Sequence, residues 1–298
     1  MKKTIDLIGV ASDSGLHIKG TSLGSTSFRQ NGIIQAIESL NLEINDLGDL
    51  TPDAIADNNC SNGLKKLNEV NCVNTKLYHS VIITLSENRF PLILGGDHSL
   101  AVGSCLAAKT AFDNIGLIWI DAHGDFNTDK ITGSGNIHGM SYSAVTTGEP
   151  CQIIPFYEKA KGFINPENCV LIGVRDLDKE EEIRLINFGI TVISMQDIFD
   201  KGIKNAIDKV ISVTSGIDSP TSGIYLSFDI DSLDPALAPA VSTPVGNGLE
   251  IADVQEIFDA IKQTNKLIGA EFVELNPLKD VDNKTAKAVI NLICRLLS

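Results

Sequence analysis

Short apolar runs recur along this 298-residue chain, and most of them are followed by a segment with helical spacing. This alternation constrains the fold more than any other feature. The runs are rich in Ile, Val and Leu and alternate little with polar residues, which is typical of strands buried on both faces. The predicted strands are Ile5–Val10, Leu92–Leu94, Gly116–Asp121, Val170–Val174, Thr191–Ser194, Ile224–Asp231 and Ile268–Asn276.

The helical segments lie between these runs. The predicted helices are Ser25–Leu40, Thr75–Asn88, Ser99–Phe112, Lys179–Asn187, Ile203–Thr214, Ile251–Gln263 and Lys284–Leu297. Alternating strands and helices predict an α/β fold of three layers (α/β/α) with a mostly parallel sheet of about eight strands. The polar, Asn-rich stretch Thr51–Asn74 is interpreted as an excursion between elements rather than a linker, so we predict one domain over residues 1–298.

The charge balance narrows the classes of partner. Lys and Arg total 24 against 38 Asp and Glu, giving a formal net charge of −14. Nucleic acid and anionic membrane surfaces are disfavoured, because both need a basic face. An acidic chain suits cations, although most of these acids could simply lie on a solvated surface.

Several other features indicate a cytoplasmic protein. No apolar stretch approaches the ~18 residues of a membrane helix. The N-terminal apolar run resembles a first strand more than a signal peptide. The six cysteines are scattered without a CxxC pair, which favours reduced thiols.

Acidic side chains gather where two of the predicted strands end. Asp121, His123 and Asp125 close one strand, and they would project to the same side if the extended conformation continues. Asp229 and Asp231 close another strand with the same spacing. In open parallel sheets, ligands bind outside the carboxyl ends of the strands. These five side chains are therefore expected at one functional edge.

His98 joins this group because Gly95 and Gly96 allow a tight turn that aims it back over the strand ends. Four carboxylates so close would repel one another without counter-ions, and two divalent cations would balance them. Oxygen ligands with some imidazole and no thiolate favour Mn²⁺ over a structural Zn²⁺. A lone Asp after a strand is usually a turn residue or a cap, so it is the combination that predicts a binuclear metal site.

Six sequence blocks resemble the arginase–agmatinase family (ureohydrolases), and the resemblance covers nearly the whole chain. The blocks are Gly95–Ser99, Asp121–Thr128, Ser134–Gly139, Ser227–Pro235, Ala238–Pro244 and Glu271–Pro277. The resemblance implies a single α/β domain with a parallel sheet and a binuclear manganese site, two Mn²⁺ per subunit with Co²⁺ as a possible substitute. It assigns one ion to His98, Asp121, Asp125 and Asp229, and the other to His123, Asp121, Asp229 and Asp231.

Within the family, the run SGNIHG and the segment from Val170 to Ile183 look like the arginase branch. The resemblance places Asp178 near the α-amino group of L-arginine, with Glu181 supporting it. It places Asn127, Thr132 and Ser134 on the α-carboxylate. Without the resemblance, the last three are a polar loop, and the two acids are equally a helix N-terminal cluster.

The implied reaction is hydrolysis of the guanidinium group to urea and L-ornithine by a hydroxide that bridges two Mn²⁺. His138 matches the family's proton-shuttle histidine, and Glu274 matches the acid that orients the guanidinium. Thr243 matches a threonine near the metal-bound water. The predicted catalytic residues are His138, Glu274 and Asp125; the alternative for Glu274 is a buried structural acid.

Other functions are left open. The nearest is a sister ureohydrolase acting on agmatine, guanidinobutyrate or formiminoglutamate. A catalytically silent metal-binding protein is a further alternative, and a binuclear phosphatase ranks last because no basic cluster could hold a phosphate.

Three positions depart from the family pattern. Ser25 stands where a Pro is usual, and Gly124 where many relatives have Thr. Ala252 stands where many arginases place an Arg used between subunits. The family resemblance nevertheless implies a homo-oligomer, a trimer or a hexamer.

Overall fold

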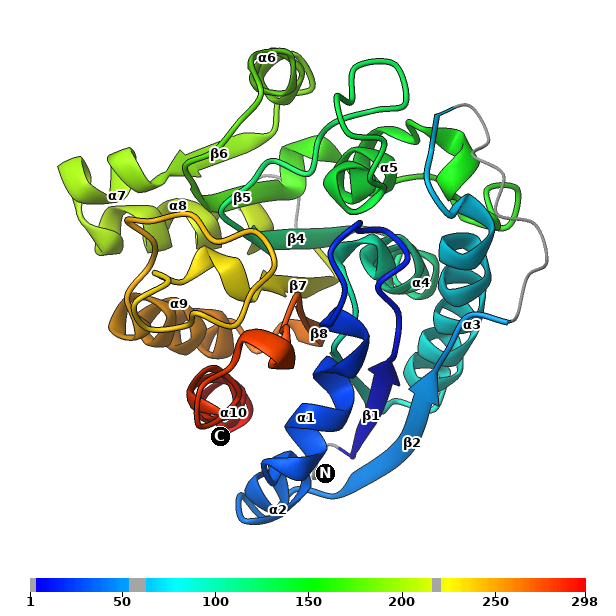
Figure 1. Cartoon of the computed structure of the whole chain (residues 1–298). Coiled ribbons are helices and arrows are strands. Elements are labelled where there is room, and N and C mark those ends of the chain that lie inside the picture. Colours follow the sequence, from blue (N-terminus) through cyan, green and yellow to red (C-terminus); the bar gives the residue numbers. More distant parts are fainter. Residues whose placement is uncertain (1–3, 54–62, 216–220) are drawn as a thin grey trace.

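A computed structural model describes residues 4–53, 63–215 and 221–298. In this part of the chain, eight strands form one sheet in the order β2-β1-β3-β8-β7-β4-β5-β6 (Figure 1). Every ladder between neighbouring strands is parallel. The strands are β1 (Ile5–Val10), β2 (Ile44–Leu50), β3 (Phe90–Leu94), β4 (Ile115–Ile120), β5 (Cys169–Val174), β6 (Thr191–Ser194), β7 (Gly223–Asp229) and β8 (Leu267–Val273).

Helices cover both faces of the sheet, so the three-layer α/β/α prediction is confirmed (Figure 1). One hydrophobic core receives side chains from α1 (Gly24–Gln30), α2 (Ile33–Glu38), α7 (Met195–Lys201), α8 (Ile203–Ser215), α9 (Ile251–Gln263) and α10 (Lys284–Leu297). The other core receives side chains from α3 (Leu67–Ser86), α4 (Ala101–Ala111), α5 (Ser141–Thr147) and α6 (Lys179–Asn187).

Burial explains why the strand pattern could be recognised. Strands β1, β3, β4, β5 and β7 are buried at every residue. Both faces of such a strand lie under helices, so its sequence is a continuous apolar run instead of an alternating one.

Strand β2 is absent from the sequence prediction. It lies at the edge of the sheet and pairs only with β1, and its five central residues are exposed. Its sequence INDLGDL is polar because an edge strand faces solvent.

The helix predicted over Ser25–Leu40 is two helices. Gly32 caps α2 with a φ of 87°, a left-handed conformation that ends α1 and redirects the chain. The interpretation of Thr51–Asn74 as an excursion is wrong at its C-terminal end, because α3 already begins at Leu67. Residues 54–62 of that stretch lie outside the described residues. The short helices α5 and α7 were not predicted either.

Two further observations concern the whole described part of the chain. The five cysteines in it, Cys72, Cys105, Cys151, Cys169 and Cys294, are free of disulfide bonds. Among the same residues, none of the helices combines the length and hydropathy that crossing a membrane requires.

Candidate metal centre and active site

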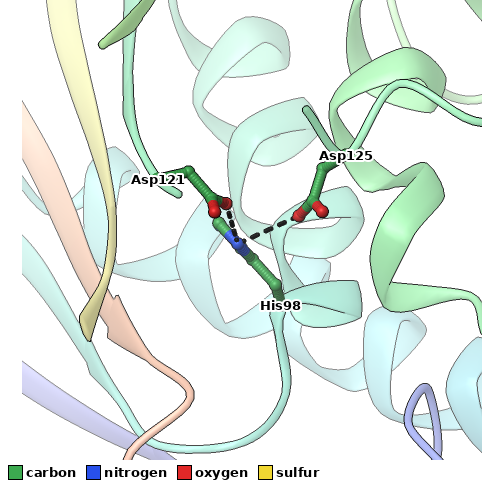
Figure 2. Close-up of side chains that lie close together, drawn as sticks. All are labelled: His98, Asp121 and Asp125. Atoms are coloured by element: carbon green, nitrogen blue, oxygen red, sulfur yellow. Dashed lines mark ion pairs between the residues drawn. The ribbon is translucent and has the colours of Figure 1, made fainter. Parts of the chain in front are cut away.

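The site lies at the carboxyl ends of the central strands. Strand β4 is next to β7, and β8 separates β7 from β3. Asp121 follows β4 directly, Asp229 is the last residue of β7, and His98 follows β3 after the turn at Gly95 and Gly96. Segments far apart in sequence therefore meet at one edge, where Figure 2 shows His98 between Asp121 and Asp125.

The turn after β3 requires both glycines. Their φ angles are 83° at Gly95 and 79° at Gly96, values that residues with a Cβ rarely adopt. A Cβ on Gly95 would also lie 2.4 Å from the backbone nitrogen of Ser25. The expectation that this turn directs His98 back over the strand ends agrees with the structure.

A single ring nitrogen of His98 faces three carboxylates. Its Nδ1 lies 3.0 Å from Asp121 Oδ2, 3.1 Å from Asp125 Oδ2 and 3.1 Å from Asp229 Oδ2. The ring is fully buried, and Nδ1 has no hydrogen-bond partner of good geometry. One N–H could serve only one of these oxygens, whereas a cation between them would serve all. His98, Asp121 and Asp125 are spaced to hold a metal ion.

A second group shares Asp121. His123 Nδ1 lies 3.4 Å from Asp121 Oδ1 and 3.2 Å from Asp231 Oδ2, and these three side chains could also hold a metal ion. Thr243 donates its hydroxyl to the same Asp231 Oδ2 at 2.9 Å. Asp121 thus belongs to both groups, as a bridging ligand would.

The acids converge by a different backbone path from the extended one that the sequence predicts. Strand β4 ends before Asp121, and Asp125 has a φ of 48°, so the extended conformation does not continue. Asp231 lies in a 3₁₀ turn, where its backbone N–H donates to Asp229 Oδ1 at 2.8 Å. Turns, rather than the period of a strand, bring these acids together.

The electrostatics of the cluster fit bound cations. Burial raises the pKa of Asp125 and of Asp229, and neighbouring carboxylates raise both further. Burial also opposes ionisation of Asp121, but the neighbouring imidazoles of His123 and His98 lower its pKa overall. Within the described residues, the ion pairs of these acids are all with histidine. Four carboxylates and two imidazoles without a Lys or Arg suit hard divalent ions.

His138 and Glu274 form a separate pair at the edge of this cluster. His138 Nδ1 lies 3.3 Å from Glu274 Oε1. Burial alone would lower the pKa of His138, but the hydrogen bond to Glu274 and its charge raise it to about 9. Glu274 has a φ of 66° and is 1% exposed, and its Oε2 is unpartnered. Such backbone strain at a polar residue is characteristic of functional sites.

A cavity of about 190 Å³ adjoins the cluster. Its lining residues are His123, Asp125, Asn127, His138, Gly139, Asp176, Asp178, Glu181 and Thr243. The cavity therefore contacts predicted metal ligands, predicted catalytic residues and part of the predicted substrate site.

Asp178 and Glu181 do form a helix N-terminus, since they make a capping box at the start of α6. They also reach beyond it. Glu181 accepts a hydrogen bond from the backbone of Phe126 at 2.6 Å, and Asp178 accepts one from the Asn127 amide at 3.3 Å. Burial raises the pKa of Glu181 to about 7. A Cβ on Gly124 would lie 2.5 Å from the Glu181 carboxyl carbon, so Gly124 makes room for this acid.

Thr132 and Ser134 lie outside the cavity lining. The hydroxyl of Thr132 accepts hydrogen bonds from the backbones of Ser134 and Gly135, at 3.3 and 3.0 Å, so it shapes the loop. Ser134 is exposed. The structure does not bring these two residues to the site with the others.

Comparison with known proteins identifies the family. The sequence matches the Arginase family over residues 3–298. It is 38% identical to an arginase of Staphylococcus aureus strain MRSA252, over 98% of this chain and 96% of the relative. The chain belongs to the arginase family.

Solved structures agree with this membership. Arginase from Bacillus cereus superposes with a TM-score of 0.92 at 36% identity, over 100% of this chain and 99% of the other. The arginase from Entamoeba histolytica, determined in complex with L-ornithine, gives a TM-score of 0.89 at 26% identity, with both chains fully covered.

Sequence reasoning missed several side chains of this arginase-family chain that contact the metal-ligand candidates His98 and Asp121. Trp119 donates from Nε1 to Asp121 Oδ2 at 3.0 Å and stacks on the His98 ring, with centroids 4.1 Å apart. Ser227 lies 2.8 Å from the other nitrogen of His98. Ser227 donates a hydrogen bond to Glu271, and both residues stand inside blocks that resemble the family. That resemblance is the signal by which they could have been found.

Proposed function

We propose that this chain is an arginase that hydrolyses L-arginine to L-ornithine and urea with two Mn²⁺ bound at the strand-end cluster. The observation that carries the proposal is the pairing of that cluster with a cavity lined by His138, Asp178 and Asn127. The first of these residues can move a proton, and the other two can bind a substrate with a charged amino acid end.

The proposed ligands are His98, Asp121, Asp125 and Asp229 for one ion, and His123, Asp121, Asp229 and Asp231 for the other. The substrate needs strong activation, because guanidinium is a delocalised cation that stays protonated at neutral pH. Two bound divalent ions supply a hydroxide nucleophile near neutral pH by lowering the pKa of water.

Glu274 is proposed to orient the guanidinium group. Its Oε1 is occupied by the backbone N–H of His98, at 2.9 Å, and by His138, whereas Oε2 is buried and unpartnered. A carboxylate oxygen left free in this way suits the planar N–H donors of a guanidinium. Thr243, bonded to Asp231, is proposed to lie beside the nucleophilic water.

His138 is proposed to deliver the proton that the departing amine of ornithine requires. The imidazolium is favoured by Glu274, and the ring lines the cavity. General acids positioned in this way contribute about 10²–10⁴-fold to turnover.

Asp178, Glu181 and Asn127 are proposed to recognise the amino acid end of the substrate. Thr132 and Ser134, which lie outside the cavity lining, are assigned to the α-carboxylate by the family resemblance alone. Asp178 and Glu181 both line the cavity, and Glu181 also accepts a hydrogen bond from the backbone of Phe126, next to Asn127. The names of the relatives and the L-ornithine bound by the Entamoeba histolytica arginase support a substrate of this kind.

A urea assay tests the proposal directly. The Mn²⁺-loaded chain is supplied with L-arginine, agmatine, guanidinobutyrate or formiminoglutamate. Urea is measured for the first three and formamide for the last, and bound metal is measured on the same sample. We expect urea from L-arginine and about two Mn²⁺ per chain. Preference for agmatine would indicate a sister ureohydrolase, and no product from any substrate at full metal loading would indicate a silent metal-binding protein.

The variant Asp178→Ala separates the two substrate ends. Loss of a hydrogen bond to a charged group costs about 1.5–3 kcal/mol, so KM for L-arginine should rise about 10–100-fold. Guanidinobutyrate, which has no α-amino group, is the comparison, because agmatine keeps that amine. An equal rise in KM for L-arginine and for guanidinobutyrate would contradict recognition of the α-amino group by Asp178.

We further propose a cytoplasmic homo-oligomer. The exposed Ala252 on α9 removes one Arg contact that many arginases use between subunits. Light scattering on the loaded chain distinguishes a trimer or hexamer from a monomer.

A further inference from the structure

His98 is held in place on the side away from the carboxylates. Its ring lies parallel to Trp119, with an interplanar angle of 12°, and Trp119 in turn stacks on Tyr142. Stacking fixes the plane of the ring but not which nitrogen carries the proton. The second contact, between His98 Nε2 and the Ser227 hydroxyl at 2.8 Å, involves that proton directly.

Ser227 connects His98 to Glu271, an acid that no catalytic step uses. Ser227 Oγ lies 2.6 Å from Glu271 Oε1. Glu271 is fully buried in β8, and its other oxygen accepts from Tyr225 at 3.2 Å and from the Ser104 hydroxyl. Burial raises the pKa of Glu271, but the surrounding hydroxyls and His98 oppose that effect.

The direction of these hydrogen bonds follows from counting donors and acceptors. The hydroxyls of Ser227, Ser104 and Tyr225 all point at the Glu271 carboxylate, and three donors suit an ionised acceptor. With these donors in place, Ser227 donates its single O–H to Glu271. The Ser227 oxygen can then only accept from His98, which places the imidazole hydrogen on Nε2. The lone pair of Nδ1 is left facing the three carboxylates, where a metal ligand requires it.

We propose that Glu271 is a positioning residue for the metal site, acting through Ser227 to hold His98 in the orientation and tautomer that present Nδ1 to the metal. This inference rests on the proposed metal centre. Partners behind a ligating histidine fix its ring and increase its basicity, and their loss lowers metal affinity about 10–100-fold.

The sequence offers a matched pair of substitutions. Ser227→Ala removes the link between Glu271 and His98, whereas Ser104→Ala removes a different hydroxyl that donates to the same carboxylate. Both serines are fully buried, so the two variants lose the same atom in similar surroundings. Glu271→Gln keeps the shape of the side chain and removes its charge.

The first measurement is Mn²⁺ binding by equilibrium dialysis, with circular dichroism to establish folding. We expect Ser227→Ala to weaken one of the two ions about 10–100-fold and Glu271→Gln to weaken the same ion less, with Ser104→Ala close to the parent. Equal losses in Ser227→Ala and Ser104→Ala, or none in either, overturn the inference. A parent chain that fails to bind two ions contradicts the metal centre itself instead.

The second measurement needs no variant. The parent chain is labelled with ¹⁵N-histidine and filled with diamagnetic Zn²⁺, and NMR then reports which His98 nitrogen carries hydrogen. A hydrogen on Nε2 supports the proposed chain of hydrogen bonds from His98 through Ser227 to Glu271. A hydrogen on Nδ1, or coordination through Nε2, overturns it even if the variants fail to fold.

Discussion

Two clusters of aspartates in this molecule differ in the groups that offset the repulsion between their negative charges. On the edge strand β2, Asp46 and Asp49 share Arg29, which lies 2.7 Å from the first and 2.5 Å from the second. At the carboxyl ends of β4 and β7, the ion pairs of the four aspartates are all with histidine in the described part of the chain. The first cluster contains an Arg, whereas no Lys or Arg among the described residues forms an ion pair with the second.

The two clusters also differ in pKa. The hydrogen bond from Arg29 lowers the pKa of Asp46, whereas burial raises the pKa of Asp229 well above its ordinary value. A chain with 24 basic residues could have placed one beside Asp229. Asp46 and Asp49 are paired within the chain, whereas the acids of the arginase-family site are arranged so that they could hold metal ions.

The largest expected effect comes from removing an acid of the site. Asp125→Ala should lose one Mn²⁺ and lower urea turnover about 1000-fold, because ~4 kcal/mol of electrostatic stabilisation disappears. Asp46→Ala is the control from the other cluster and should keep both ions and full turnover. Bound metal and initial rates of urea formation are measured on both variants. An active Asp125→Ala enzyme that holds two ions would show that Asp125 is not a metal ligand.

A residue beside the metal cluster should affect chemistry without affecting metal. His138→Asn is expected to lower kcat about 100-fold or more, because the departing amine loses its proton donor. Metal content and thermal unfolding serve as controls and should match the parent. If turnover is unchanged, His138 has no part in proton transfer.

The pH dependence of His138 tests the pairing with Glu274. In the metal-free chain, Glu274→Gln should lower the pKa of His138 from about 9, since the hydrogen bond and the charge of Glu274 are lost and only the weaker effects of Asp125 and Asp97 then oppose burial. In the parent chain the pKa of His138 is higher in the folded state than in the unfolded state. The contribution of the His138–Glu274 pair to the free energy of unfolding is therefore complete below pH 6.5 and is lost as pH rises through about 9. NMR titration of His138 checks the first statement, and unfolding at several pH values checks the second.

The smallest effect is expected at β2. Arg29→Ala leaves Asp46 and Asp49 unpaired, but the three side chains are partly exposed, so the cost should be about 1 kcal/mol or less. Turnover should stay at the parent level. Urea denaturation at low and high salt measures the difference, which salt should reduce. A loss of activity in this variant would mean that β2 supports the site.

Most of the fold could be predicted from the sequence, because the buried strands are continuous apolar runs and the amphipathic helices have regular helical spacing of apolar residues. Helix α6 over Lys179–Asn187 and strand β6 over Thr191–Ser194 have the predicted bounds. Strand β2 was not predicted because most of its residues face solvent and one of its acids pairs with Arg29, so its sequence is polar and lacks the apolar run of a core strand. Edge strands lack the pattern on which such predictions depend.

The candidate site was predictable as a set of residues but not as a geometry. The acids could be placed at strand ends, yet the turn that carries Asp125 depends on a left-handed backbone that no spacing rule anticipates. Side chains behind the site, such as Trp119 and Glu271, resemble ordinary core residues in a linear sequence. Only their contacts with His98 and Asp121 distinguish them.

The left-handed backbone at Asp125 and Glu274 has a consequence for the life of the protein in a cell. Each such residue costs about 1–3 kcal/mol, and repulsion between unneutralised acids adds to that cost. Bound ions offset it, since any ligand of the folded state stabilises that state. Chains made during metal shortage should therefore unfold more often and be degraded sooner, so that the amount of this protein follows the supply of metal.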